Sequence, residues 1–289
     1  MPSVIGTEND DTLKGSSSLD VLIGLEGNDT LIGTSGPDTL NGGEGTDVAD
    51  YSSFGQAITL EAVGFVDKKG LGKDQLINIE TIVGDASQTN TIDGSTGTSN
   101  VTSFYVDLSQ EGLIVNDIPF NPPTNFTFTV RNFVNVTGIN LSDTLVGNDR
   151  DNKLIGKSGD DVLKGEDGND TLEGGNGDDL LKGGNDNDTL LGDNDQDEIF
   201  GESGNDSIQG GNGNDTVFGG LGNDSIFGSP GNDRLSGDEG DDLINGDDGN
   251  DEIFGGVGND NLFGGEGNDT IFGQAGDDEI SGGNGTDEL

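Results

Sequence analysis

The second half of the chain repeats one nine-residue unit without an insertion or a deletion. Residues 147–289 read as fifteen complete units and a last unit of eight residues, for example GGNGNDTVF at 210–218 and GGEGNDTIF at 264–272. Glycine fills the first column and Leu, Ile or Val the eighth; aspartate fills the sixth after the first unit, which has Asn152. A strict short period predicts a solenoid, because each unit has to stack on a copy of itself.

The residue types in each column decide which kind of solenoid is expected. A helix needs apolar residues three and four positions apart, and a single aliphatic column at a spacing of nine does not provide them. Glycine in the first, often the second and usually the fourth column suggests backbone with positive φ. We therefore expect about six residues of turn to alternate with about three of strand. The aliphatic residue in the middle of each strand should face inwards.

The aspartate column indicates a bound cation. Stacked turns place these carboxylates in rows, and such rows repel each other unless a cation lies between them. A hard divalent ion with six to eight oxygen ligands suits carboxylates and backbone carbonyls, and the chain has no His or Cys. These residues favour Ca²⁺. The alternative is that these aspartates only form a solvated polar turn. Solvation does not require aspartate in one fixed column, so the pattern argues against that alternative.

The GGxGxDx(L/I/V)x units resemble those of the repeats-in-toxin (RTX), or hemolysin-type calcium-binding, family. The resemblance implies an all-β, right-handed parallel β-roll or β-helix solenoid, in which two units make one 18-residue turn and contribute one strand to each of two facing sheets. It also implies that Ca²⁺ lies between a loop and the loop one turn later, bound by sixth-column aspartates and turn carbonyls. The ligands expected in the C-terminal array are Asp161, Asp170, Asp179, Asp188, Asp197, Asp206, Asp215, Asp224, Asp233, Asp242, Asp251, Asp260, Asp269, Asp278 and Asp287.

Three segments are expected along the chain. Residues 1–50 hold five further units, of which the first two lack the fourth glycine, so the ligands expected there are Asp29, Asp38 and Asp47. Residues 51–146 contain two similar halves, 57–94 and 103–147, in which Asn78 corresponds to Asn132. We interpret them as degenerate solenoid with longer, calcium-poor turns; a separate globular domain is the competing interpretation. Residues 147–289 form the C-terminal calcium-binding roll.

Composition limits the classes of partner. The formal net charge of −46 and the low apolar content predict disorder in the absence of a ligand. Pairing each sixth-column aspartate with the one 18 residues later gives up to about 16 calcium ions. Eleven basic against 57 acidic residues argue against nucleic-acid binding. No apolar run could span a bilayer. The first residues already belong to a repeat, so we expect no cleavable secretory leader.

The chain offers no catalytic constellation, because without His or Cys it lacks the usual general bases and nucleophile–base pairs. We expect a calcium-binding structural module of a secreted or cell-surface bacterial protein, adhesive or layer-forming, that is not an enzyme. The resemblance adds type I secretion machinery as a partner. The alternative is an export and folding module of a secreted toxin or hydrolase whose active part lies elsewhere. Phenylalanines in the ninth column either pack as ladders on the outer face or form a stripe for self-association or a surface ligand: Phe200, Phe218, Phe227, Phe254, Phe263 and Phe272.

Overall fold

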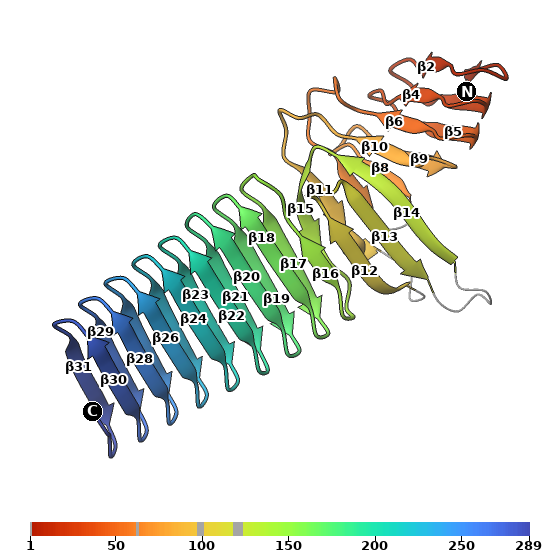
Figure 1. The fold of residues 1–289 in the computed structure, drawn as a ribbon. Coiled ribbons are helices and arrows are strands. Elements are labelled where there is room, and N and C mark those ends of the chain that lie inside the picture. Colours follow the sequence, from red (N-terminus) through yellow and green to blue (C-terminus); the bar gives the residue numbers. More distant parts are fainter. Residues whose placement is uncertain (1, 62–63, 97–100, 118–123) are drawn as a thin grey trace. The chain divides into compact units, whose positions relative to one another are not determined.

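A computed structural model describes residues 2–61, 64–96, 101–117 and 124–289 of the chain (Figure 1). The described residues form β-strands and one short 3₁₀ helix, η1 (Gly94–Thr96). They divide into two compact units, Met1–Thr137 and Gly138–Leu289. The predicted all-β solenoid is confirmed. No helix in the described part of the chain is long and apolar enough to cross a membrane.

The C-terminal unit is a stack of parallel strands that alternate between two sheets (Figure 1). One sheet contains the odd-numbered and the other the even-numbered strands. The strands are β16 (Thr144–Val146), β17 (Lys153–Ser158), β18 (Val162–Asp167), β19 (Thr171–Asn176), β20 (Leu180–Asn185), β21 (Thr189–Asn194), β22 (Glu198–Ser203), β23 (Ser207–Asn212), β24 (Thr216–Leu221), β25 (Ser225–Pro230), β26 (Arg234–Glu239), β27 (Leu243–Asp248), β28 (Glu252–Val257), β29 (Asn261–Glu266), β30 (Thr270–Ala275) and β31 (Glu279–Asn284).

The register of this unit is 18 residues, as the resemblance to the RTX repeats implies. Leu154 pairs with Leu172 in one sheet, and Leu163 pairs with Leu181 in the other. The aliphatic residues of the eighth column are buried from Leu145 to Ile271, so they form the core between the sheets. One aliphatic side chain per unit is a thin core, and burying such a side chain stabilises the fold by only about 1.5–3 kcal/mol.

The strands are longer than expected. From β17 onwards each runs for six residues and includes the first three residues of the following unit. Strand pairing includes the ninth-column residue and omits the first-column glycine that follows it. It then resumes in the second and third columns, where Lys157 pairs with Gly175 and Ser158 with Asn176. The expected division into six turn and three strand residues was therefore wrong. The inter-turn pairing continues through the second column even though Gly175 has a φ of 120°.

The N-terminal unit begins in the same way and then changes. Strands β1, β3 and β5 pair in parallel in one sheet, and β2, β4 and β6 do so in the other. The strands of this unit are β1 (Ser3–Ile5), β2 (Thr12–Lys14), β3 (Val21–Glu26), β4 (Thr30–Ile32), β5 (Thr39–Glu44), β6 (Val48–Asp50), β7 (Thr59–Glu61), β8 (Phe65–Asp67), β9 (Lys73–Ile77), β10 (Thr81–Val83), β11 (Asn90–Asp93), β12 (Val101–Asp107), β13 (Gly112–Asp117), β14 (Thr124–Arg131) and β15 (Phe133–Thr137).

The two similar halves of residues 51–146 each contribute an antiparallel insertion. Strands β7, β8 and β9 pair antiparallel in one sheet, and β12, β13 and β14 do so in the other. Asn78 and Asn132 have positive φ, 49° and 63°, at matching places after β9 and β14. The internal duplication therefore has a structural counterpart, but antiparallel strands replace the long turns that we expected.

Candidate metal centre

The aspartates of the sixth column are buried although they carry ionisable groups. Asp161 is 1% exposed, Asp224 is 2% and Asp29 is 0%. Asp278 and Asp287, in the last two units, are more exposed. Burying an ionised carboxylate is costly unless it is paired or binds a metal. Burial of the column therefore raises the free energy of the folded chain unless hydrogen bonds or a cation compensate the carboxylates.

Hydrogen bonds connect each column aspartate to the previous turn on the same side. The backbone N–H of Asp161 donates to Oδ1 of Asp179 at 2.7 Å, and that of Asp224 donates to Oδ1 of Asp242 at 2.8 Å. The bond recurs up to Asp269 and Asp287, at 3.2 Å. All eighteen aspartates that the sequence suggests as ligands accept such a bond.

The second carboxylate oxygen is buried and accepts no hydrogen bond from the residues that the structure describes. This holds for Oδ2 of Asp29, Asp47, Asp161, Asp170, Asp179, Asp188, Asp197, Asp206, Asp215, Asp224, Asp233, Asp242, Asp251, Asp260 and Asp269. An unsatisfied buried charge of this kind normally marks a strained or a ligand-binding position. Its repetition at these fifteen positions indicates one kind of ligand for all of them.

The first-column glycine is needed for space and not for positive φ, which corrects the sequence interpretation. No first-column glycine among the described residues has positive φ. A Cβ atom added to Gly210 would lie 2.5 Å from Oδ2 of Asp215 and 2.9 Å from the carbonyl oxygen of Gly228, one turn later. Positive φ is confirmed for glycines in the second and fourth columns, such as Gly211 and Gly213.

Backbone carbonyls supply further oxygen atoms between successive loops. A Cβ atom on Gly211 would collide with the carbonyl oxygen of Asp193, and one on Gly213 with that of Asp195. The carbonyls of the second and fourth columns therefore point at the loop 18 residues later. Among the described residues no three acidic side chains gather into a metal cluster. A Ca²⁺ ion needs six to eight oxygen ligands, which can be carboxylates and backbone carbonyls. Each loop offers few carboxylates, and its backbone carbonyls supply further oxygens, so the residues fit Ca²⁺.

The pKa values of these carboxyls reflect their burial. Burial raises the pKa of Asp161 and Asp179 to about 7 and that of Asp197 to about 8. The backbone hydrogen bond from the previous turn opposes this shift, and carboxylates of neighbouring loops add to it. In the metal-free chain these three carboxyls thus hold protons near neutral pH, and a divalent cation would displace them.

The structure adds column residues that the sequence analysis missed. Gly138, Asp143 and Leu145 form one more unit before residue 147: Asp143 is 3% exposed and its N–H donates to Oδ1 of Asp161 at 2.6 Å. The columns at a spacing of nine already contained this signal, although Leu141 stands in place of the fourth glycine.

Two further acids extend the columns in the N-terminal unit. Asp74 accepts from the N–H of Asp38 at 2.7 Å, and Glu80 accepts from that of Asp47 at 2.8 Å. They lie 36 and 33 residues further along the chain and not 18, so pairing residues one period apart does not find them.

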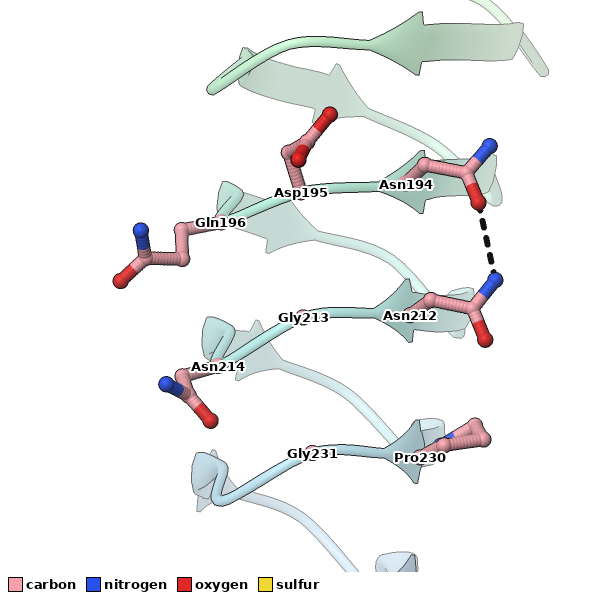
Figure 2. Close-up of a pocket in the computed structure, with 8 residues that line it drawn as sticks. All are labelled: Asn194, Asp195, Gln196, Asn212, Gly213, Asn214, Pro230 and Gly231. Carbon is pink, nitrogen blue, oxygen red and sulfur yellow. Dashed lines mark hydrogen bonds between the residues drawn. The ribbon is translucent and has the colours of Figure 1, made fainter.

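Asp186 and Asp195 occupy the fourth column in place of glycine, with φ values of 77° and 76°. Asp195 lies above Gly213 and Gly231, the fourth residues of the next two loops on that side, beside an open cavity (Figure 2). Its Oδ2 accepts a hydrogen bond from the N–H of Gly177 at 3.2 Å. A left-handed conformation costs a non-glycine residue about 1–2 kcal/mol. These two loops are therefore expected to be looser or to hold an additional cation at their side.

Replacing both residues with glycine (Asp186→Gly, Asp195→Gly) should raise the melting temperature in calcium by roughly 4–8 °C, because about 2 kcal/mol of strain disappears. Differential scanning calorimetry would measure this. The matched variant Asp186→Asn, Asp195→Asn removes the charges but keeps side chains at positive φ, and it should gain less. A fall in melting temperature for the glycine variant would mean that the two carboxylates are themselves ligands.

Comparison with known protein families agrees with this geometry. The sequence profile described as the RTX calcium-binding nonapeptide repeat (4 copies) matches residues 5–40, 23–53, 137–172, 155–190, 164–199, 191–226, 227–262 and 254–289. The third of these matches includes Asp143. None of the curated proteins matches the chain.

Proposed function

Because the chain belongs to the RTX calcium-binding nonapeptide repeat family, we propose that it binds its Ca²⁺ ions between loops that lie 18 residues apart. It is a calcium-binding repeat module and not a member of a catalytic family. The proposed ligands are the sixth-column aspartates from Asp29 to Asp47 and from Asp161 to Asp287, with Asp143 added. Up to about 16 ions would bind, each to two turns.

One observation carries this proposal: the buried Oδ2 atoms without a hydrogen-bond partner among the described residues. They recur at the period of the loops and lie beside glycine positions that leave room for oxygen atoms of the next turn. About 16 divalent ions would also offset roughly two thirds of the net charge of −46.

The proposed place of action is outside the cell. Extracellular calcium modules bind in the range of about 10⁻⁴–10⁻³ M, well above the calcium level inside cells. A chain that folds only on binding calcium would remain extended before export and fold after it. We therefore propose a secreted or cell-surface protein, exported by type I secretion machinery and without enzymatic activity.

An adhesive or layer-forming role is supported by aromatic ladders on the outer faces. Phe200 stacks on Phe218 with ring centroids 5.2 Å apart, and Phe254 stacks on Phe272 at 5.4 Å. Ser236 separates the two stacks in the register of the sheet. Exposed apolar strips of this kind tend to mark interfaces.

A cation lies over one ring of each stack. Nζ of Lys182 lies 5.0 Å from the ring centroid of Phe200, and the guanidinium carbon of Arg234 lies 4.5 Å from that of Phe254. Few basic residues are present in this acidic chain, and two of them are used here. The outer face of the even-numbered sheet thus combines aromatic and basic groups, a composition suited to binding a surface or a second copy of the chain.

Changing all six ninth-column phenylalanines to threonine should preserve calcium-dependent folding but reduce self-association or adhesion. Threonine retains a preference for strands and removes the aromatic surface. Sedimentation velocity in calcium would measure association, cell-surface binding would measure adhesion, and circular dichroism would verify the fold. If the original chain is monomeric and non-adherent, the ladders are packing only. The alternative, a folding module for a longer secreted toxin or hydrolase, would then be favoured.

A further inference from the structure

Lys68 is fully buried in a chain whose other described lysines and arginines have at least partial access to solvent. It follows β8 in the antiparallel insertion of the N-terminal unit. Its ammonium donates to the carbonyl oxygen of Thr34 at 2.7 Å, to that of Gly36, and to Oδ1 of Asp74. A lysine ammonium has three N–H donors, and these three acceptors use all of them. Nζ also lies 3.9 Å from Oδ2 of Asp38.

The four oxygens around this ammonium belong to the repeat and not to the insertion alone. Thr34, Gly36 and Asp38 are the second, fourth and sixth residues of the unit at 33–41. Asp74 continues their column, because its Oδ1 accepts the N–H of Asp38 at 2.7 Å, as the next sixth-column aspartate does in every regular turn. The ammonium therefore lies between two consecutive loops, among the oxygen types proposed above as calcium ligands.

The carboxylate of Asp38 differs from most of its column. Its Oδ2 accepts from the hydroxyl of Thr34 at 2.6 Å and faces Lys68. Asp38 is therefore absent from the buried oxygens that have no hydrogen-bond partner among the described residues, whereas Asp29 and Asp47, on the other side of the roll, are among them. Donors also reach Oδ2 of Asp11, Asp20 and Asp143, so what distinguishes Asp38 among the described column aspartates is the nearby ammonium of Lys68.

Aromatic side chains cover this position. The hydroxyl of Tyr51 donates to Oδ2 of Asp74 at 2.8 Å, and its ring fills the space where a Cβ atom on Gly33 would lie. The ring centroid of Phe54 lies 6.0 Å from Nζ of Lys68. Burial raises the pKa of Tyr51 well above its usual value, so its hydroxyl remains a donor to Asp74. The carboxylates, the ammonium and the rings together form a closed site.

We propose that the ammonium of Lys68 is a tethered cation that takes the place of Ca²⁺ between the Asp38 and Asp74 loops. This inference rests on the calcium positions proposed above, and it removes the Asp38–Asp74 position from the calcium sites. An intramolecular cation does not depend on the free calcium concentration. The joint between β5 and β9, at which the parallel stack meets the antiparallel insertion, is therefore held together without metal.

The test is the number of calcium ions bound by Lys68→Ala, counted by native mass spectrometry of the full chain at saturating calcium. Alanine removes the ammonium and leaves the four oxygens, so this variant should bind one Ca²⁺ more than the original chain. Lys69→Ala, an exposed neighbour with the same charge change, should bind the original number. Equal counts for all three chains would overturn the inference. Failure of the proposed function would appear separately, as an original chain that binds no calcium.

A second measurement covers a variant that does not fold. The original chain is treated with an amine-acylating reagent in calcium chelator, and the modified lysines are identified by peptide mass spectrometry. Lys68 should react much more slowly than Lys69 and Lys73, because the closed site forms without metal. Equal reactivity of the three lysines in chelator, with protection of Lys68 only when calcium is present, would overturn the inference.

Discussion

Removal of calcium should unfold the C-terminal unit, Gly138–Leu289. Without a cation, the buried Oδ2 atoms from Asp161 to Asp269 are not compensated, and one aliphatic residue per unit cannot offset the lost chain entropy. Binding to the folded state alone adds about 2.7 kcal/mol for each site at a calcium concentration 100 times its dissociation constant. Circular dichroism at neutral pH should therefore change from a β spectrum in calcium to a disordered one in chelator.

A pair of matched variants tests whether the column aspartates are responsible. Asp251→Asn changes a buried column residue, and Asp248→Asn makes the same charge change three residues away at an exposed position. The first should raise the calcium concentration needed for folding, and the second should leave it nearly unchanged. A full β spectrum of the original chain in chelator at neutral pH would contradict the linkage of folding to calcium.

Acid should partly replace calcium. Burial raises the pKa of Asp206 to about 6 and that of Asp197 to about 8 in the metal-free fold, against 3.8 for an ordinary Asp. Between these values the folded chain binds more protons than the unfolded chain. Each raised carboxyl thus contributes stability that is complete below the unfolded pKa and is lost as the pH rises through the folded pKa. The calcium-free chain should gain β structure between about pH 7.5 and about pH 5.5.

The same protons compete with the metal, so calcium affinity should fall over this range. A calcium titration by circular dichroism at both pH values would measure the two effects together. Asp197→Asn should weaken the pH dependence, because the column then has one titrating group fewer; asparagine already occupies the column at Asn152, where it is buried. Asp248→Asn, an equal charge change at an exposed position, is the control. Equal β content at both pH values in chelator would mean that burial of the column does not oppose folding.

The repeat columns were sufficient to predict a β-solenoid, and the resemblance to the RTX repeats added its 18-residue register. The single aliphatic column predicts strands with one inward residue each, the resemblance to the RTX repeats implies two strands per 18-residue turn, and Leu154 does pair with Leu172. The same columns predicted which aspartates line up, because a residue in a solenoid always lies above its counterpart one turn earlier. Local sequence is informative here because contacts at a spacing of 18 repeat identically along the chain.

What the period cannot express was decided only by the tertiary structure. The first-column glycine is required because a Cβ atom would occupy the space of a neighbouring carboxylate and a carbonyl of the next turn, a contact between turns that backbone preference does not reveal. Asp74 joins the column of Asp38 across 36 residues because antiparallel strands intervene. The place of Lys68 among the loop carbonyls follows from that insertion. Such long-range contacts depend on how the chain returns to the stack, and no local pattern records that path.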